Sequence, residues 1–120
     1  LVNIPHPFDM LRGLRLDGKE LEALVEQIDA VEVFNAREPF RKPSAKAQTF
    51  AQKYGIPGTV GSDAHTIGEI GNAYIEMPEF NGRDDFLNAL VKGKVFGHRT
   101  NPLIHFVTAW AKLKSKLKGQ

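Results

Sequence analysis

The sequence predicts an α/β domain in which mainly parallel strands alternate with helices. Short apolar runs rich in β-branched residues alternate with longer segments whose apolar residues recur every three or four positions. Strands separated by helices in this way are typical of βαβ units. The 120 residues are enough for one domain and one core, but too few for a complete α/β barrel of about 250 residues.

The first elements are predicted from their apolar patterns. Residues 1–5 are an apolar run ended by proline, as expected of a buried strand. A helix is expected over residues 17–28, because apolar side chains recur there at helical spacing. They are Leu21, Leu24, Val25 and Ile28. The β-branched residues of segment 30–36 predict a second strand, and residues 43–55 predict a helix closed by Gly55.

The next elements are short. A third strand is expected at residues 57–63. Thr66 and Glu69 stand three residues apart, the spacing of a capping box, and predict a brief helix over residues 66–72. A fourth strand is expected at residues 73–77.

Two further helices complete the prediction. The first covers residues 82–93, with Phe86, Leu87, Leu90 and Val91 on one side. Residues 95–101 are expected to link it to the last helix. That helix would carry an apolar stripe of Leu103, Phe106, Val107, Trp110, Leu113 and Leu117, with Asn101 and Pro102 at its start.

Composition limits the possible classes of function. Hydrophobic residues make up 42% and charged residues 25% of the chain, as in ordinary soluble proteins. No run approaches the roughly 18 apolar residues of a membrane span, so we expect no membrane partner. The absence of cysteine fits a cytoplasmic location. The balance of 16 basic and 14 acidic side chains supports a nucleic-acid partner only weakly. Because cysteine is absent, a metal would need histidine, carboxylate or asparagine ligands.

Polar residues suited to metal binding follow three expected strands. They are His6, Asn35 and the Asp63/His65 pair. Ligands gather at the carboxyl ends of parallel strands, and extended residues two apart point to the same side. Carboxylate and imidazole together suit Zn, Mn or Fe. Since two ligands are too few for a tight site, His6 is the best further candidate.

Spacing alone leaves structural alternatives open. Asp63 could bond nearby backbone amides in a turn while His65 merely packs. His6 precedes a proline and could be a loop corner. His105 falls among apolar residues of the last helix and would be a partly buried, hydrogen-bonded imidazole. His98 could face a substrate or solvent.

Several arginines lie in expected loops or helix starts. They are Arg12, Arg15, Arg37, Arg41 and Arg99. The planar guanidinium group matches phosphate oxygens, although most surface arginines bind no phosphate. Arg99 and Arg12 are the favoured candidates, because they lie nearest to the supposed site.

Four segments in order resemble the C-terminal part of the PHP (polymerase and histidinol phosphatase) family. They are "PHPFD", "VEVFNAR", "AKAQTFAQKYGIPGTVGSDAHTIGEIGNAYIEM" and "GKVFGHRTNPLIHF", and "GSDAH" followed by "EIG" is the most specific part. PHP proteins are distorted seven-stranded (β/α) barrels that hold two or three divalent metals at the C-terminal face of the strands. The resemblance implies that residues 1–120 are one partial domain, the last half of such a barrel without its N-terminal part.

The resemblance also implies roles for particular residues. His6 corresponds to a histidine metal ligand, and Asp63 and His65 correspond to the final Asp-x-His pair of ligands. Arg99 and Arg12 look like positions that contact phosphate. No catalytic group beyond the metal ligands is implied. A full PHP domain begins with a His-x-His motif and adds further ligands, and none of those motifs occurs in this sequence.

The activity implied by the resemblance is metal-dependent hydrolysis of phosphate mono- or diesters by the intact protein. The cofactors would be two or three Mn, Zn or Fe ions, and the substrate a phosphorylated small molecule or nucleotide. We expect the 120-residue chain alone to be nearly inactive and to self-associate through an uncovered sheet edge. The alternatives are a non-catalytic accessory module, with a possible link to nucleic-acid metabolism, and a plain binding domain without phosphate chemistry.

Overall fold

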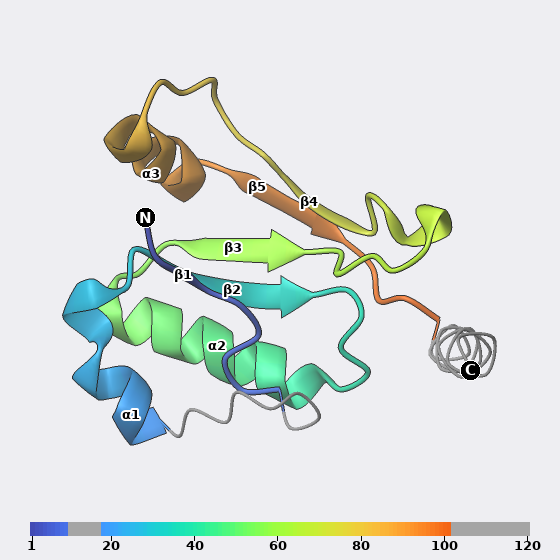
Figure 1. The fold of residues 1–120 in the computed structure, drawn as a ribbon, viewed down its shortest axis with the longest axis horizontal. Helices are drawn as coiled ribbons and strands as arrows, with labels where there is room; N and C mark the ends of the chain where they lie inside the picture. The colour runs from blue at the N-terminus through green and yellow to red at the C-terminus, as the bar shows by residue number, and fades with distance from the viewer. Residues whose placement is uncertain (10–17, 102–120) are drawn as a thin grey trace, which may run out of the picture.

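The computed structural model describes residues 1–9 and 18–101, which form two sheets and their covering helices (Figure 1). The first sheet is parallel, with three strands in the order β1-β2-β3. Its strands are β1 (Asn3–Ile4), β2 (Ala30–Asn35) and β3 (Gly58–Gly61). The second sheet pairs β4 (Ala73–Glu76) with β5 (Lys94–Gly97) in antiparallel orientation. The mixed α/β class and the parallel sheet agree with the sequence prediction, whereas a half barrel is not shown.

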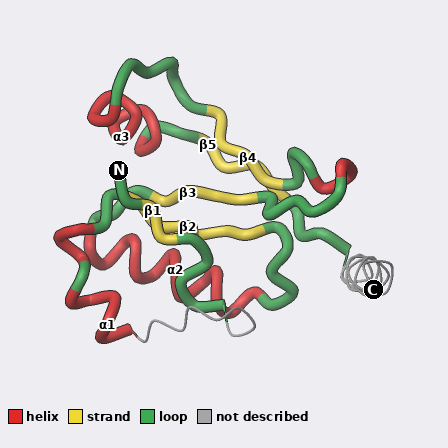
Figure 2. Tube along the Cα trace, in the orientation of Figure 1, coloured by secondary structure: helices red, strands yellow, loops and turns green. Residues whose placement is uncertain are grey.

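The helices lie on different sides of the three-stranded sheet. They are α1 (Gly18–Ala23), the 3-10 turn η1 (Val25–Gln27), α2 (Arg41–Tyr54), the 3-10 turn η2 (Ile67–Glu69) and α3 (Arg83–Val91). In Figure 2, α1 and α2 lie below the sheet, while α3 and the β4–β5 pair lie above it. No helix of the described residues is both long and apolar enough to cross a membrane.

The core forms where α2 packs on β2. Its buried residues are Leu21, Ile28, Val31, Phe50, Ala51 and Ile56. Helix α2 ends as predicted at Gly55, whose φ of 65° is left-handed and whose N–H donates to the carbonyls of Ala51 and Gln52. Phe8 packs edge-on against Phe50, with ring centroids 6.1 Å apart. This contact holds the loop after β1 against the core.

Some element predictions were wrong. Residues 95–101 were expected to be a link, yet Lys94–Gly97 is strand β5. All four of its residues are exposed, so no alternation of buried and exposed residues marks the strand. The strand exists because it pairs with β4, where Tyr74 and Phe96 stack with ring centroids 5.2 Å apart. Residues 17–28 do not form one helix, since α1 ends at Ala23 and a 3-10 turn follows.

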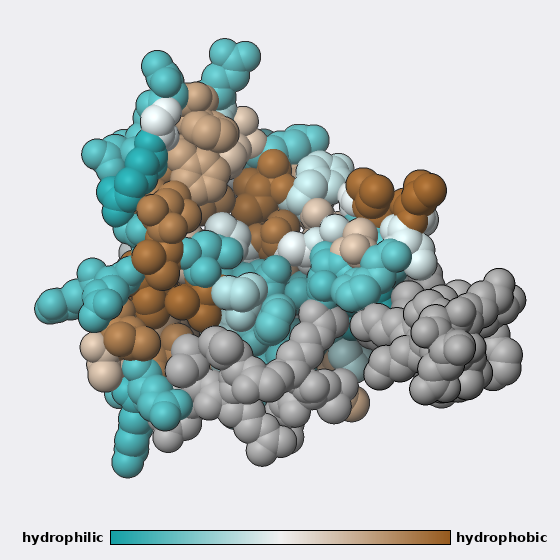
Figure 3. Space-filling model, viewed as in Figure 1, coloured by the Kyte–Doolittle hydropathy of each residue, from teal (hydrophilic) through white to brown (hydrophobic). Residues whose placement is uncertain are grey.

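The surface retains exposed apolar side chains (Figure 3). Val91, expected on the apolar side of its helix, is 71% exposed, and all four residues of β5 are exposed. Within the described residues β5 pairs only with β4, which leaves an edge of the kind that can favour association. Self-association stays a prediction. The last expected helix, with His105, and the candidate Arg12 lie outside the described residues.

Candidate metal-binding site

The predicted ligand positions follow strands that end at one edge of the parallel sheet. His6 comes two residues after β1, Asn35 is the last residue of β2, and Asp63 comes two residues after β3. Asn35 pairs in register with Gly61, the last residue of β3. The parallel pairing therefore directs these loops toward the same edge, as expected of a ligand-binding face.

The carboxylate of Glu32 joins the ends of all three strands. Its Oε2 accepts hydrogen bonds from the backbone N–H of His6 at 2.8 Å and from Nδ2 of Asn35 at 3.2 Å. A Cβ added to Gly61 would lie 2.2 Å from Oε1 of Glu32, so any larger residue at this position would require the carboxylate to shift. Glu32 thus stands between His6 and the loop that carries Asp63. Sequence analysis missed it, although an acidic residue inside the apolar strand was a usable signal.

Replacing Gly61 by alanine is expected to displace Glu32 from its two donors. The carboxylate is the end of a flexible side chain and can move, but moving would leave the N–H of His6 and the amide of Asn35 without their acceptor. We expect a loss of about 1–3 kcal/mol in the free energy of unfolding, measured by urea denaturation, and a shifted His6 amide signal in NMR spectra.

Gly68→Ala is the matched control. A Cβ at Gly68 meets no atom within 4 Å, so the stability of this variant should be unchanged or slightly increased. Equal stability of the two variants would show that the close approach of Glu32 to Gly61 does not contribute to stability.

His6 and Asp63 also share an uncommon backbone conformation. Their φ angles of 30° and 51° are the positive values among the non-glycine residues of the described chain. Such conformations cost free energy and cluster at functional sites. The structural alternative for His6 also has support, because Pro7 is fully buried and Phe8 packs on the core. The corner after β1 therefore has a structural role in addition to any role of the His6 imidazole.

The Asp63–His65 loop sets the tautomer of its histidine. Nδ1 of His65 lies 2.8 Å from the backbone carbonyl oxygen of Asp63. A carbonyl can only accept, so Nδ1 donates, and Nε2 carries the lone pair of the neutral imidazole. This arrangement is common among metal-binding histidines. The Asp63 carboxylate is close by, with Oδ1 3.8 Å from Nδ1 of His65.

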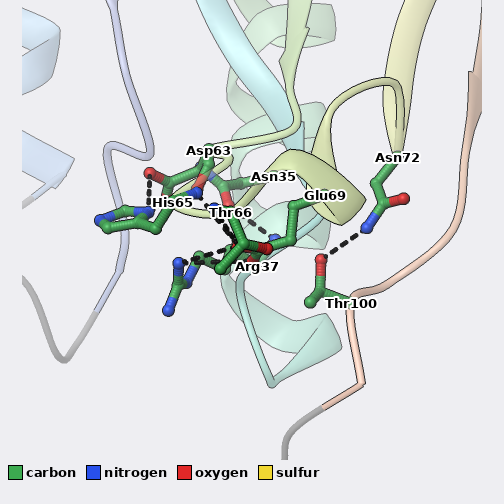
Figure 4. A network of polar contacts seen from close by, with 8 residues as sticks. All are labelled: Asn35, Arg37, Asp63, His65, Thr66, Glu69, Asn72 and Thr100. Atoms are coloured by element: carbon green, nitrogen blue, oxygen red, sulfur yellow. Dashed lines mark hydrogen bonds and ion pairs between the residues drawn. The ribbon is translucent and has the colours of Figure 1, made fainter. Parts of the chain in front are cut away.

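A fully buried glutamate holds this loop in place (Figure 4). Oε2 of Glu69 accepts hydrogen bonds from the backbone N–H of His65 at 3.0 Å, the N–H of Thr66 at 2.9 Å and Oγ1 of Thr66 at 2.9 Å. The predicted capping box is thereby confirmed. Oε1 of Glu69 lies 3.3 Å from Nη1 of Arg37. The backbone N–H of Arg37 donates to Oδ1 of Asn35. The loop after β3 is thus tied to the end of β2.

The pKa of Glu69 is lowered despite its burial. Burial works to raise the pKa, but hydrogen bonds from His65 and Thr66 and the charge of Arg37 outweigh it. The resulting stability is present above the unfolded pKa of about 4.5. It is lost as the pH falls through the lower pKa of the folded state.

The segment after β5 is fixed at the same edge. Nδ2 of Asn72 donates to Oγ1 of Thr100 at 3.0 Å (Figure 4). The backbone N–H of Thr100 donates to the carbonyl oxygen of Ala36. These bonds place Arg99, whose guanidinium donates to the carbonyl oxygen of Glu38. The predicted phosphate contact of Arg99 stays a prediction.

Glu38 provides a pH-dependent test of this region. Its side chain is 3% exposed and accepts a hydrogen bond from Ser44. Burial raises the pKa of Glu38; the bond from Ser44 and the charge of Arg99 oppose this, and the charges of Asp9 and Glu32 add to it. A raised carboxyl pKa means that ionisation at neutral pH opposes folding.

Glu38→Gln is therefore expected to raise the free energy of unfolding at pH 7. The gain should shrink as the pH falls through the folded pKa and vanish below about 4.5, where the carboxyl of either state is neutral. Urea denaturation at pH 7 and at pH 4 measures the difference. A glutamine variant that is less stable than the original protein at pH 7 would contradict a raised pKa of Glu38.

The donors present fit a divalent cation in part. Asp63 and His65 supply a carboxylate oxygen and an imidazole nitrogen from one loop, a pair suited to Mn, Zn or Fe. Within residues 1–9 and 18–101, no group of three or more His, Asp or Glu residues is arranged to hold a metal ion. The ligand set His6, Asp63 and His65 therefore stays a prediction, and a tight site needs further donors.

Comparison with known proteins supports the resemblance seen in the sequence. An uncharacterized protein of Methanocaldococcus jannaschii is 42% identical over 84 residues, which cover 68% of this chain and 35% of the relative. The chain thus spans about a third of the length of that relative. No solved structure matches the chain. Residues 43–95 match the family described as PHP-associated. This segment carries Asp63, His65 and Glu69, and its match to the PHP-associated family agrees with the resemblance to the C-terminal part of PHP proteins.

Proposed function

We propose that this chain forms the C-terminal part of a metal-dependent phosphoesterase that hydrolyses phosphate mono- or diesters. The observation that carries the proposal is the Asp63–His65 loop. It lies within the segment that matches the PHP-associated family, and the buried Glu69 fixes its backbone. A loop held this firmly has its two donor side chains preorganised for a ligand.

Asp63 and His65 would hold a cation of Mn, Zn or Fe. His65 would bind through Nε2, because Nδ1 donates to the carbonyl of Asp63. His6, across the Glu32 carboxylate, would be the third ligand from this chain. Bound divalent cations supply Lewis acidity that polarises a phosphoryl group. The remaining metal ligands would come from other parts of the intact protein. Its substrate would be a phosphorylated small molecule or nucleotide.

Removal of metal from the intact protein tests this function. Hydrolysis of p-nitrophenyl phosphate should be lost after EDTA treatment and restored by Mn²⁺, with two or three ions per chain by elemental analysis. The 120-residue chain alone should show little turnover under the same conditions. An intact protein that holds no metal and hydrolyses no phosphate ester would instead favour the non-catalytic accessory module.

A further inference from the structure

An apolar hollow lies between the last turns of α2 and the start of β5. Its volume is about 410 Å³, and no charged side chain of the described residues lines it. Its lining includes Val33, Ala51, Ile75, Leu90, Val91 and Val95. Val91 is 71% and Val95 52% exposed. Apolar side chains therefore still meet water here, which a further packed segment would relieve.

The strands direct apolar side chains into this hollow. Ile75 and Val95 are direct partners in the β4–β5 ladder, so their side chains share one face of that sheet. A Cβ added to Gly93 would lie 2.5 Å from Cγ2 of Ile75, and one added to Gly58 would lie 2.8 Å from Cγ2 of Val33. Both glycines line the hollow. Ile75 and Val33 thus lie against its backbone walls and form its floor.

The hollow continues along one flank of α2. Four residues of this flank line it at helical spacing: Gln48, Ala51, Gln52 and Gly55. The same flank continues toward the start of the helix, where Arg41, Ser44, Ala45 and again Gln48 line a neighbouring polar hollow. Because Gln48 borders both, the two hollows form one groove beside α2. The 14 residues of this helix span about 21 Å.

The described chain ends near the polar end of this groove. Gly97, His98 and Arg99 line that end, and residues 102–120 follow two positions later. The apolar stripe expected in that segment runs from Leu103 to Leu117, which as a helix would also be about 21 Å long. Its lysines fall between the positions of the stripe, at Lys112, Lys114, Lys116 and Lys118. The stripe therefore matches the groove in length and begins where the groove begins.

We propose that residues 102–120 dock into this groove as an amphipathic helix beside α2 and antiparallel to β5. Helix α2 is a precedent within the chain, because it follows β2 and returns over it, with Phe50 and Val31 in one core. A second return of this kind would cover Val91 and Val95 with the apolar stripe and leave the lysines in water. Docking needs neither metal nor substrate, so it is independent of the proposed hydrolysis.

Trp110 reports on docking, because it is the one tryptophan of the chain and lies in the middle of the stripe. An indole in apolar surroundings emits at shorter wavelength than free tryptophan and is quenched less by acrylamide. We expect both properties in the unmodified 120-residue chain. Val91→Glu should shift the emission toward that of free tryptophan and increase quenching, because docking would bury an unpaired carboxylate. Far-UV circular dichroism shows whether the variant is folded.

The matched control is Ile70→Glu. Ile70 is also 71% exposed, but it does not line the groove, so this variant should keep the emission of Trp110. If Val91→Glu fails to fold, Val95→Glu places the same charge in the groove from β5. A solvent-exposed Trp110 in the unmodified chain, or equal emission of the Val91 and Ile70 variants, would overturn the proposal. So would an emission shift on dilution, which would place the segment on a second copy.

Discussion

Replacement of Glu69 by alanine is expected to lower the free energy of unfolding by about 3–5 kcal/mol, the usual cost of removing one partner from a buried ion pair. Arg37 is 4% exposed and would lose the carboxylate with which it forms a buried ion pair. The backbone N–H groups of His65 and Thr66 would lose their acceptor as well. Urea denaturation at pH 7 measures the change, and NMR signals of the 63–66 loop should shift with it.

The matched control is Glu22→Ala. Glu22 also forms an ion pair, with Lys53 at 2.9 Å, but 46% of its side chain is exposed. Exposed pairs contribute little to stability, so this variant should unfold close to the original. A double replacement of Arg37 and Glu69 by methionine should recover part of the loss, since the buried guanidinium is removed together with its carboxylate. A small effect of Glu69→Ala would mean that the pair does not hold the loop.

Replacement of Asp63 by alanine is expected to reduce kcat/KM of the intact protein for a phosphate ester by more than about 100-fold. Residues that only orient a metal ligand already cost 10- to 100-fold when they are removed, and Asp63 is proposed as a ligand itself. The metal content per chain should fall in parallel. Stability should fall only slightly, because Asp63 holds a left-handed φ of 51° that alanine adopts at a somewhat greater cost than aspartate.

Asp84→Ala serves as the control for Asp63→Ala. The side chain of Asp84 is 87% exposed and lies on α3, where it pairs with Arg83. Metal content and kcat/KM should both be retained in this variant. A folded Asp63→Ala protein with full metal content and turnover would remove Asp63 from the site.

Local features of the chain were predictable because their partners are near in sequence. The capping box joins Thr66 to Glu69, three residues away, and Gly55 closes α2 onto its own last turn. The Asp63/His65 pair lies on one loop for the same reason. An exception is β5, whose four residues are all exposed, so that the strand is recognised only once β4 is known to lie beside it.

The sequence by itself determined the α/β class, the order of most elements and the loop that carries Asp63 and His65. Only the tertiary structure placed Glu32 between His6 and Gly61, and only it paired Glu69 with Arg37, 32 residues earlier in the chain. Apolar periodicity and caps act over one or two helical turns, so they can be read along the chain. A buried carboxylate takes its partners from whichever strands and loops the packed core brings to it.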